Sequence, residues 1–181
     1  MIATPAKRLK NIYAFIDASN IYHGAKNAGF EVDYAKLKNY LTSRFGATHL
    51  FYFGAFDIKK QDDLLLKEQL TTLGYEIKEV ALSKFKDGKT KADVDSRMTF
   101  EIMNMKSEYD EAVVITGDGD FYWVLEHLIQ IKKKVSLVGM AGRTSRKLTQ
   151  LFKTNFIHLG NVRKSIEKTD KKETIIIKDN I

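Results

Sequence analysis

Short apolar runs alternate along the chain with longer segments in which apolar residues recur every three or four positions. The apolar runs are rich in Val, Ile, Phe and Tyr, which is typical of buried β-strands. They cover residues 12–17, 49–56, 75–82, 111–116, 134–139 and 155–160. The last of these, NFIHLG, is the expected final strand of the sheet.

The segments between the runs have the periodicity of amphipathic helices. They cover residues 33–45, 59–73, 92–107, 119–132 and 144–152. Strands that alternate with helices are typical of βαβ units, because consecutive parallel strands need a crossover connection. The pattern therefore predicts an α/β fold, with a mainly parallel central sheet and helices on both faces. Residues 83–91, SKFKDGKTK, lack any apolar periodicity and predict a Lys-rich loop.

The length of 181 residues fits one ordinary domain that buries a sizeable core. There is no internal repeat, and the single proline rules out a Pro-rich linker. We expect a domain over residues 11–162, an N-terminal extension over 1–10 and a charged C-terminal tail over 163–181.

The composition narrows the chemistry and the setting. The chain has no cysteine, which excludes disulfides, thiolate metal sites and a cysteine nucleophile. The N-terminus has no apolar stretch long enough for a signal peptide, and no run approaches a membrane span. We therefore expect a cytoplasmic protein that does not bind membranes, and the sequence leaves open whether it forms a homo-oligomer.

The net charge makes nucleic acid the partner to consider first. The formal charge is +7 and the pI is about 9.4. Clustered Lys and Arg gain affinity for nucleic acids by releasing counterions from phosphates. The simpler interpretation is that the charge only keeps the protein in solution.

Three acidic residues follow predicted strands. Asp17 ends the first run in FIDASN, and Asp118 and Asp120 follow the fourth in ITGDGDF. Ligands of open parallel sheets bind at the carboxyl ends of strands where the winding reverses, so these carboxylates converge if the two strands are neighbours. Gly117 and Gly119 would let the backbone turn and leave room for a ligand. The simpler alternative is that Asp17 and Asp118 cap helices and that Asp120 suits a first helical turn.

A fourth acid comes from the helical segment KADVDSRMTFEIMNM. At about 100° per residue, Asp95 and Glu101 flank the apolar stripe on opposite sides and border the core. Asp93 points nearly the opposite way and stands four residues before Arg97, which suits a solvated ion pair or a helix cap. We therefore favour Asp95 over Asp93 as the functional acid.

Carboxylates that meet in one pocket cannot all stay ionised without a cation, because each raises the pKa of the others. Hard oxygen ligands suit Mg²⁺ or Mn²⁺. Such an ion can bind a phosphodiester oxygen, lower the pKa of an attacking water and stabilise the leaving oxygen. The chain has no Walker loop, GxSxG elbow or HExxH motif that would support other chemistry.

Three segments, FIDASN, VDSRMTFE and TGDGDF, resemble in order and spacing the motifs of the NYN domain, in its LabA-like branch of the PIN-like nuclease superfamily. The resemblance covers about residues 11–160. It implies a PIN-like three-layer α/β/α sandwich and a metal-dependent endoribonuclease. The catalytic and metal-binding residues that it implies are Asp17, Asp95, Asp118 and Asp120. Departures from the family pattern are Glu101, Thr116 and Gly119, which replace the more usual Asp, Ser and Ser.

Other residues are candidates for a supporting role. Asn20 would assist the metal or the substrate phosphate, and Thr116 and Glu101 border the same acids. The basic residues expected to bind the RNA backbone are Lys84, Lys86, Lys89, Lys91, Arg143, Arg146 and Lys147. Aromatic candidates for base stacking are Tyr22, His23, Phe56, Tyr122 and Trp123, with Tyr22 and His23 preferred.

The leading hypothesis is hydrolysis of single-stranded or structured RNA at a Mg²⁺ or Mn²⁺ site. One alternative is a non-catalytic RNA-binding or regulatory module that retains the pocket. Another is a phosphatase of the haloacid dehalogenase type, which also has an Asp after its first strand. That family needs a second acid two residues later, and Ser19 occupies this position.

Overall fold

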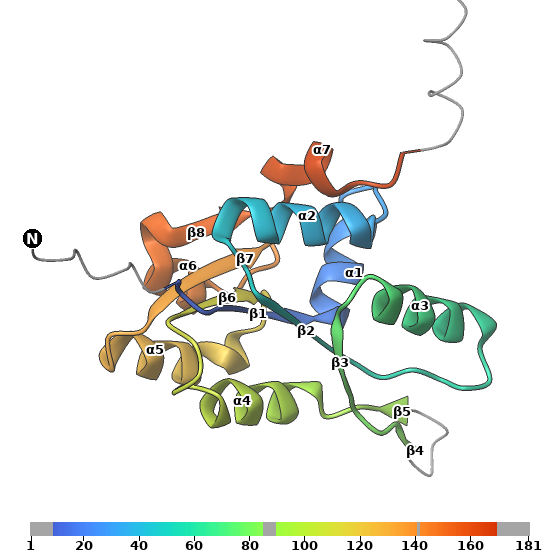
Figure 1. Ribbon diagram of the computed structural model, residues 1–181, viewed down its shortest axis with the longest axis horizontal. Coiled ribbons are helices and arrows are strands. Elements are labelled where there is room, and N and C mark those ends of the chain that lie inside the picture. The colour runs from blue at the N-terminus through green and yellow to red at the C-terminus, as the bar shows by residue number, and fades with distance from the viewer. Residues whose placement is uncertain (1–8, 85–89, 141, 170–181) are drawn as a thin grey trace, which may run out of the picture.

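The computed structural model describes residues 9–84, 90–140 and 142–169, with only the backbone at 83–84 and 90–91. Its centre is a six-stranded sheet with the strand order β3-β2-β1-β6-β7-β8, and every neighbouring pair is parallel (Figure 1). The strands are β1 (Ile12–Asp17), β2 (His49–Gly54), β3 (Glu76–Glu79), β6 (Glu111–Ile115), β7 (Lys134–Gly139) and β8 (Phe156–His158). The predicted α/β fold with a parallel sheet is confirmed.

Helices connect consecutive strands of this sheet, and one more helix follows the last strand. They are α1 (Ala18–Asn27), α2 (Tyr34–Phe45), α3 (Gln61–Thr72), α4 (Val94–Asn104), α5 (Tyr122–Gln130), α6 (Arg146–Phe152) and α7 (Arg163–Ile166). Short 3₁₀ turns η1 (Gly119–Phe121), η2 (Lys153–Asn155) and η3 (Leu159–Val162) extend the connections. The five predicted helical segments each contain one of these helices. The segment 119–132 begins as η1 and continues as α5.

Three parts of the described chain differ from the sequence prediction. Helix α1 was not among the predicted helical segments, and two of its three buried residues, Gly24 and Ala25, are small. The segment expected to be a loop without regular structure contains two short strands, β4 (Ser83–Lys84) and β5 (Thr90–Lys91), which pair antiparallel. Helix α7 lies in the segment expected to be a tail, and its Ile166 is fully buried.

Two hydrophobic cores lie on the two faces of the sheet. Along β1 the side chains alternate, so that Ile12, Ala14 and Ile16 enter one core while Tyr13 and Phe15 enter the other. Helices α1, α2, α3 and α7 contribute to the first core, and α4, α5 and α6 contribute to the second (Figure 1). The result is a three-layer α/β/α sandwich.

The order of the strands reverses beside β1. The chain builds β1, β2 and β3 outward in one direction, crosses under the sheet through α4, and then places β6 on the other side of β1. The ends of β1 and β6 and the beginning of α4 therefore meet at the carboxyl edge of the sheet, which is where ligands of such sheets bind. No helix in the described ranges is long and apolar enough to cross a membrane.

Gly139→Ala is expected to destabilise the fold by about 1–3 kcal/mol, because the new methyl group has no space. A Cβ at Gly139 would clash with Thr144 Oγ1 and would lie 2.9 Å from the Thr116 carbonyl oxygen at the end of β6. Chemical denaturation measures the change in the free energy of unfolding. Gly160→Ala is the control, since a Cβ there meets no atom within 4 Å. Equal stability of the two variants would contradict this account of the strand ends.

Candidate metal centre

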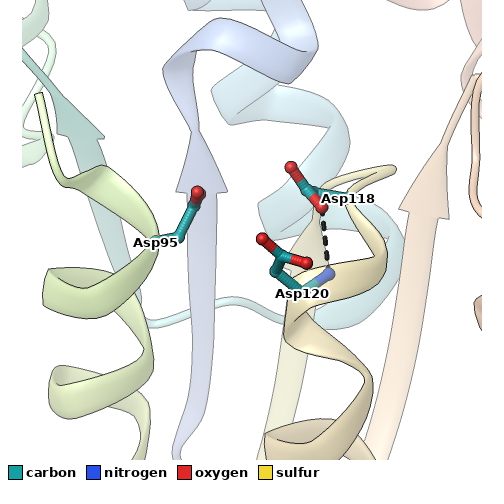
Figure 2. Close-up of side chains that lie close together, drawn as sticks. All are labelled: Asp95, Asp118 and Asp120. Atoms are coloured by element: carbon teal, nitrogen blue, oxygen red, sulfur yellow. Dashed lines mark hydrogen bonds between the residues drawn. The ribbon is translucent and has the colours of Figure 1, made fainter. Parts of the chain in front are cut away.

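Three carboxylates converge at the carboxyl edge of the sheet. Asp95, Asp118 and Asp120 each offer an oxygen, and these oxygens all lie within 4.8 Å of one another. Figure 2 shows Asp95 projecting from α4 towards the turn that carries Asp118 and Asp120. The carboxylates therefore come from two elements that are far apart in the sequence and pack against each other in the fold.

Asp95 occupies the first turn of α4 and is half-buried. The pKa of its carboxyl is raised from 3.8 to about 6, first by burial and then by the nearby charges of Asp17, Asp118, Asp120 and Asp93. The shift means that the folded protein disfavours the ionised form of Asp95.

The other acids of α4 have structural partners. Asp93 caps the helix, and its side chain accepts a hydrogen bond from the Ser96 backbone N–H at 3.3 Å. Of the two interpretations given for Asp93, the cap is confirmed and the ion pair with Arg97 is not found. Arg97 instead donates to Glu101 at 2.6 Å, one turn further along the helix. Glu101 is buried but neutralised by this pair, which takes it out of the group of converging carboxylates.

Asp118 is fixed by backbone groups on both sides. Its side chain caps η1 and accepts from the Asp120 N–H at 2.9 Å. Its own N–H donates to Thr116 Oγ1 at 3.1 Å. Asp118 is half-buried, whereas Asp120 is exposed. The second oxygen of Asp118 and both oxygens of Asp120 accept no hydrogen bond from the described residues.

Asp17 lies at the end of β1 and is almost completely buried, with 1% exposure. Its two oxygens accept hydrogen bonds from the Ser19 N–H and hydroxyl, the Asn20 N–H and amide, and the Thr116 hydroxyl, at 2.5–3.1 Å. These donors surround the carboxylate, and Asp17 is not part of the group of three. Its role as a metal ligand stays a prediction, while its role as the cap of α1 is observed.

Asn20 and Thr116 link the ends of β1 and β6. Asn20 donates to Asp17 and accepts from the Gly117 N–H at 2.9 Å. Thr116 donates to Asp17 and accepts from the N–H of Asp118, so one hydroxyl connects the buried acid to the carboxylate pair. Both residues therefore position the site through hydrogen bonds. Ser19 was not predicted as a site residue, but its N–H and its hydroxyl both donate to Asp17. The one sequence signal for this role is its position two residues after an aspartate that can cap a helix.

The two glycines of TGDGDF allow other parts of the protein to approach closely. A Cβ at Gly117 would lie 3.1–3.3 Å from Asn20, Arg143 and Thr144, and one at Gly119 would lie 2.8 Å from Ser145 Oγ. The Ser145 N–H also donates to the Gly117 carbonyl at 2.8 Å. Gly117 also borders a hollow, so the expected room for a ligand beside these glycines stays a prediction. The connection between β7 and α6 packs against both glycines and holds the acidic turn in place.

The three carboxylates lack the basic partners that the buried glutamates have. Glu111 pairs with Lys134 at 2.7 Å, and Glu101 pairs with Arg97. Among the residues that the structure describes, no basic side chain forms an ion pair with Asp95, Asp118 or Asp120. A group of three hard oxygen ligands with uncompensated charge fits a Mg²⁺ or Mn²⁺ ion.

The predicted basic residues fall into two groups. Arg143, Arg146 and Lys147 are exposed and lie between β7 and the first turn of α6, on the same edge of the sheet as the acids. Arg143 lines a hollow of about 220 Å³ together with Asn20, His23 and Gly117. Lys86 and Lys89 lie outside the described residues, and the side chains of Lys84 and Lys91 are not described, so their part in RNA binding stays a prediction.

Comparisons with known proteins identify a family, a relative and a similar fold. A family model described as the NYN domain matches residues 11–160. The chain is 27% identical to the low amplitude and bright protein LabA of Synechococcus elongatus, over 94% of this chain and 95% of that protein. A crystal structure of a protein of unknown function from Vibrio parahaemolyticus has a TM-score of 0.71 at 22% identity, covering 83% of this chain and 93% of the other. That structure shows the same fold.

Asp95→Asn is expected to stabilise the metal-free protein near neutral pH. Because the folded-state pKa of about 6 lies above the ordinary 3.8, the folded protein binds this proton more tightly than the unfolded chain. The resulting stabilisation is complete below the ordinary pKa and is lost as pH rises through the folded-state value. In EDTA at about pH 7 the variant should melt roughly 1–4 °C above the wild type, and the difference should shrink at about pH 4.

Thermal unfolding followed by circular dichroism measures this difference. Asp93→Asn is the matched control on the same helix, because Asn caps a helix as well as Asp does. An Asp95→Asn melting temperature below that of the wild type at neutral pH would show that Asp95 is not under electrostatic strain.

Asp17→Asn is expected to destabilise the protein by about 2–4 kcal/mol, because an amide nitrogen would replace an oxygen that only accepts hydrogen bonds. The Asn20 amide and the Thr116 hydroxyl both donate to that oxygen and would face another donor. Chemical denaturation gives the free energy of unfolding. The control is Asp33→Asn, since Asp33 also caps a helix but accepts there only from the Lys36 N–H. Similar losses in both variants would contradict the special role of Asp17.

Proposed function

The chain belongs to the NYN domain family, and from that premise we propose that it is a Mg²⁺- or Mn²⁺-dependent endoribonuclease. The observation that carries the proposal is the convergence of Asp95, Asp118 and Asp120 without a basic partner in the described chain. Like charges this close favour a bound cation, because a cation offsets both the burial and the repulsion that raise the pKa of Asp95. The resemblance to the PIN-like nucleases supports the assignment of ribonuclease chemistry to this site.

Each residue has a defined task in this proposal. Asp95, Asp118 and Asp120 would hold the ion through their ionised carboxylates. A bound divalent cation would polarise the scissile phosphodiester and make water a better nucleophile, so that no protein nucleophile is needed. Asp17 adds negative charge behind the group, and through Thr116 it fixes the backbone of Asp118.

The surroundings of the site favour a nucleic acid substrate. Arg143, Arg146 and Lys147 are exposed at the same edge of the sheet. They would bind the phosphates on either side of the scissile bond without pairing with the acids. The formal charge of +7 would further favour association with RNA, which we propose to be single-stranded or structured.

One observation favours a non-catalytic RNA-binding or regulatory module as the second candidate. Protein donors surround the oxygens of Asp17, so the predicted fourth ligand is engaged elsewhere in this arrangement. A site with three ligands would bind the ion more weakly. The phosphatase alternative is less favoured, because Asp17 is buried among these donors rather than presented as a nucleophile.

Asp118→Asn is expected to reduce RNA cleavage in Mn²⁺ or Mg²⁺ at least about 100-fold, since it removes a ligand charge. Wild-type cleavage should stop in EDTA and return when the ion is restored. The assay follows a generic end-labelled RNA on a denaturing gel.

The control is Asp62→Asn, which removes one exposed acid from the first turn of α3. It should cleave at the wild-type rate. Cleavage that survives both EDTA and Asp118→Asn would overturn the metal mechanism. Tight RNA binding without cleavage in either metal would favour the non-catalytic module.

A further inference from the structure

A large aromatic side chain stands exposed one helical turn from the acidic group. Trp123 is 72% exposed, the most of any aromatic residue in the described chain. Its neighbour Tyr122 lies with its ring nearly perpendicular, at 86° and 5.1 Å between ring centroids. The Tyr122 hydroxyl donates to Glu126 at 2.7 Å, which fixes that ring. The indole is therefore supported along one side by Tyr122 while most of its surface contacts solvent.

Trp123 borders a hollow between α5 and α6. The hollow has a volume of about 480 Å³ and is lined by Tyr122, Trp123, Lys147, Gln150 and Leu151. This volume lies within the range of small-molecule sites. The lining combines an aromatic surface, a cation and an amide, which are the groups that contact the base, the phosphate and the base edge of a nucleotide.

The hollow and the acids occupy the same edge of the sheet. Trp123 follows Asp120 by three residues, in the first turn of α5 directly after η1. Lys147 lies in the first turn of α6, which packs against both α5 and η1. A strand of RNA whose phosphodiester lies at the carboxylates would therefore reach this hollow with a neighbouring nucleotide.

We propose that Trp123 is a stacking platform for an unpaired base of single-stranded RNA, with Lys147 binding the adjoining phosphate and Gln150 contacting the base edge. The proposal rests on the proposed function, because it takes the RNA at the acidic group as its starting point. The charge of Lys147 and the amide of Gln150 favour a nucleotide over an apolar protein segment as the occupant. Duplex RNA does not fit, since its bases are stacked on each other and cannot reach the indole.

Trp123 can report its own contacts, because it is the one tryptophan of the chain. We expect a single-stranded RNA of about ten nucleotides to quench its fluorescence in EDTA, where no cleavage can occur. The same RNA annealed to its complement should quench it much less. Quenching of equal depth by the duplex, or no quenching while the single strand binds, would overturn the proposal.

Fluorescence anisotropy of a labelled RNA measures how much Trp123 and Lys147 contribute to the affinity for RNA. Trp123→Ala should weaken single-strand binding between about 5- and 150-fold, and Trp123→Phe should retain most of the affinity. Phe100→Ala is the matched control, because Phe100 is 59% exposed on α4 and does not line the hollow. Lys147→Gln should reduce the salt dependence of binding by a slope of about 1, whereas Trp123→Ala should leave the slope unchanged. Equal losses in Trp123→Ala and Phe100→Ala would contradict a specific platform.

The outcomes separate this proposal from the nuclease assignment. Metal-dependent cleavage without quenching would support the nuclease assignment and contradict the stacking role of Trp123. Quenching and the Trp123→Ala loss in a protein that never cleaves would establish the platform in a binding module. Unchanged thermal midpoints of the variants would show that the losses come from the RNA contact.

Discussion

The buried carboxylate of Asp17 is the constraint on which the rest of the site depends. A carboxylate with 1% exposure is stable only if hydrogen bonds replace the water that it has lost. The five donors that do so come from the first turn of α1 and from Thr116 after β6. Burying this one charge therefore fixes the separation of two strands that are far apart in the sequence. It also sets the position of the turn that carries Asp118.

The electrostatic environment of Asp95, Asp118 and Asp120 differs from that of Asp17. Asp17 is stabilised by donors, and Glu101 and Glu111 are stabilised by basic side chains. Asp95, by contrast, faces only further negative charge and has a raised pKa of about 6. A fold that pairs its other buried acids and leaves this group uncompensated concentrates its electrostatic strain at one place. A divalent cation is the simplest species that would relieve it, and this is why the metal proposal follows from the charges as well as from the family.

Much of the fold and part of the site could be predicted from the sequence. The strands were predicted because buried parallel strands have continuous apolar runs, and Asp95 was separated from Asp93 because helical phase depends only on spacing. Helix α1 was not predicted as a segment, since its buried face includes the small residues Gly24 and Ala25 and few large apolar ones. The pairing of Glu101 with Arg97, the donors around Asp17 and the contact of Ser145 with Gly119 are choices between side chains that meet only after folding. The sequence pattern does not distinguish such partners. Asp93 and Glu101, for example, both stand four residues from Arg97.

The positions of the basic side chains around the acids suit both the metal site and the Trp123 stacking platform. Basic side chains next to the carboxylates would pair with them and compete with a metal ion, so a nucleic acid site of this kind must keep its cations at a distance. Arg143 borders a hollow beside α1, and Lys147 borders a hollow beside α5. An RNA strand bound at the acids would have cations available in both hollows. Few basic side chains would then contribute to the affinity for RNA. Stacking of a base on the exposed indole of Trp123 would supply an uncharged contribution.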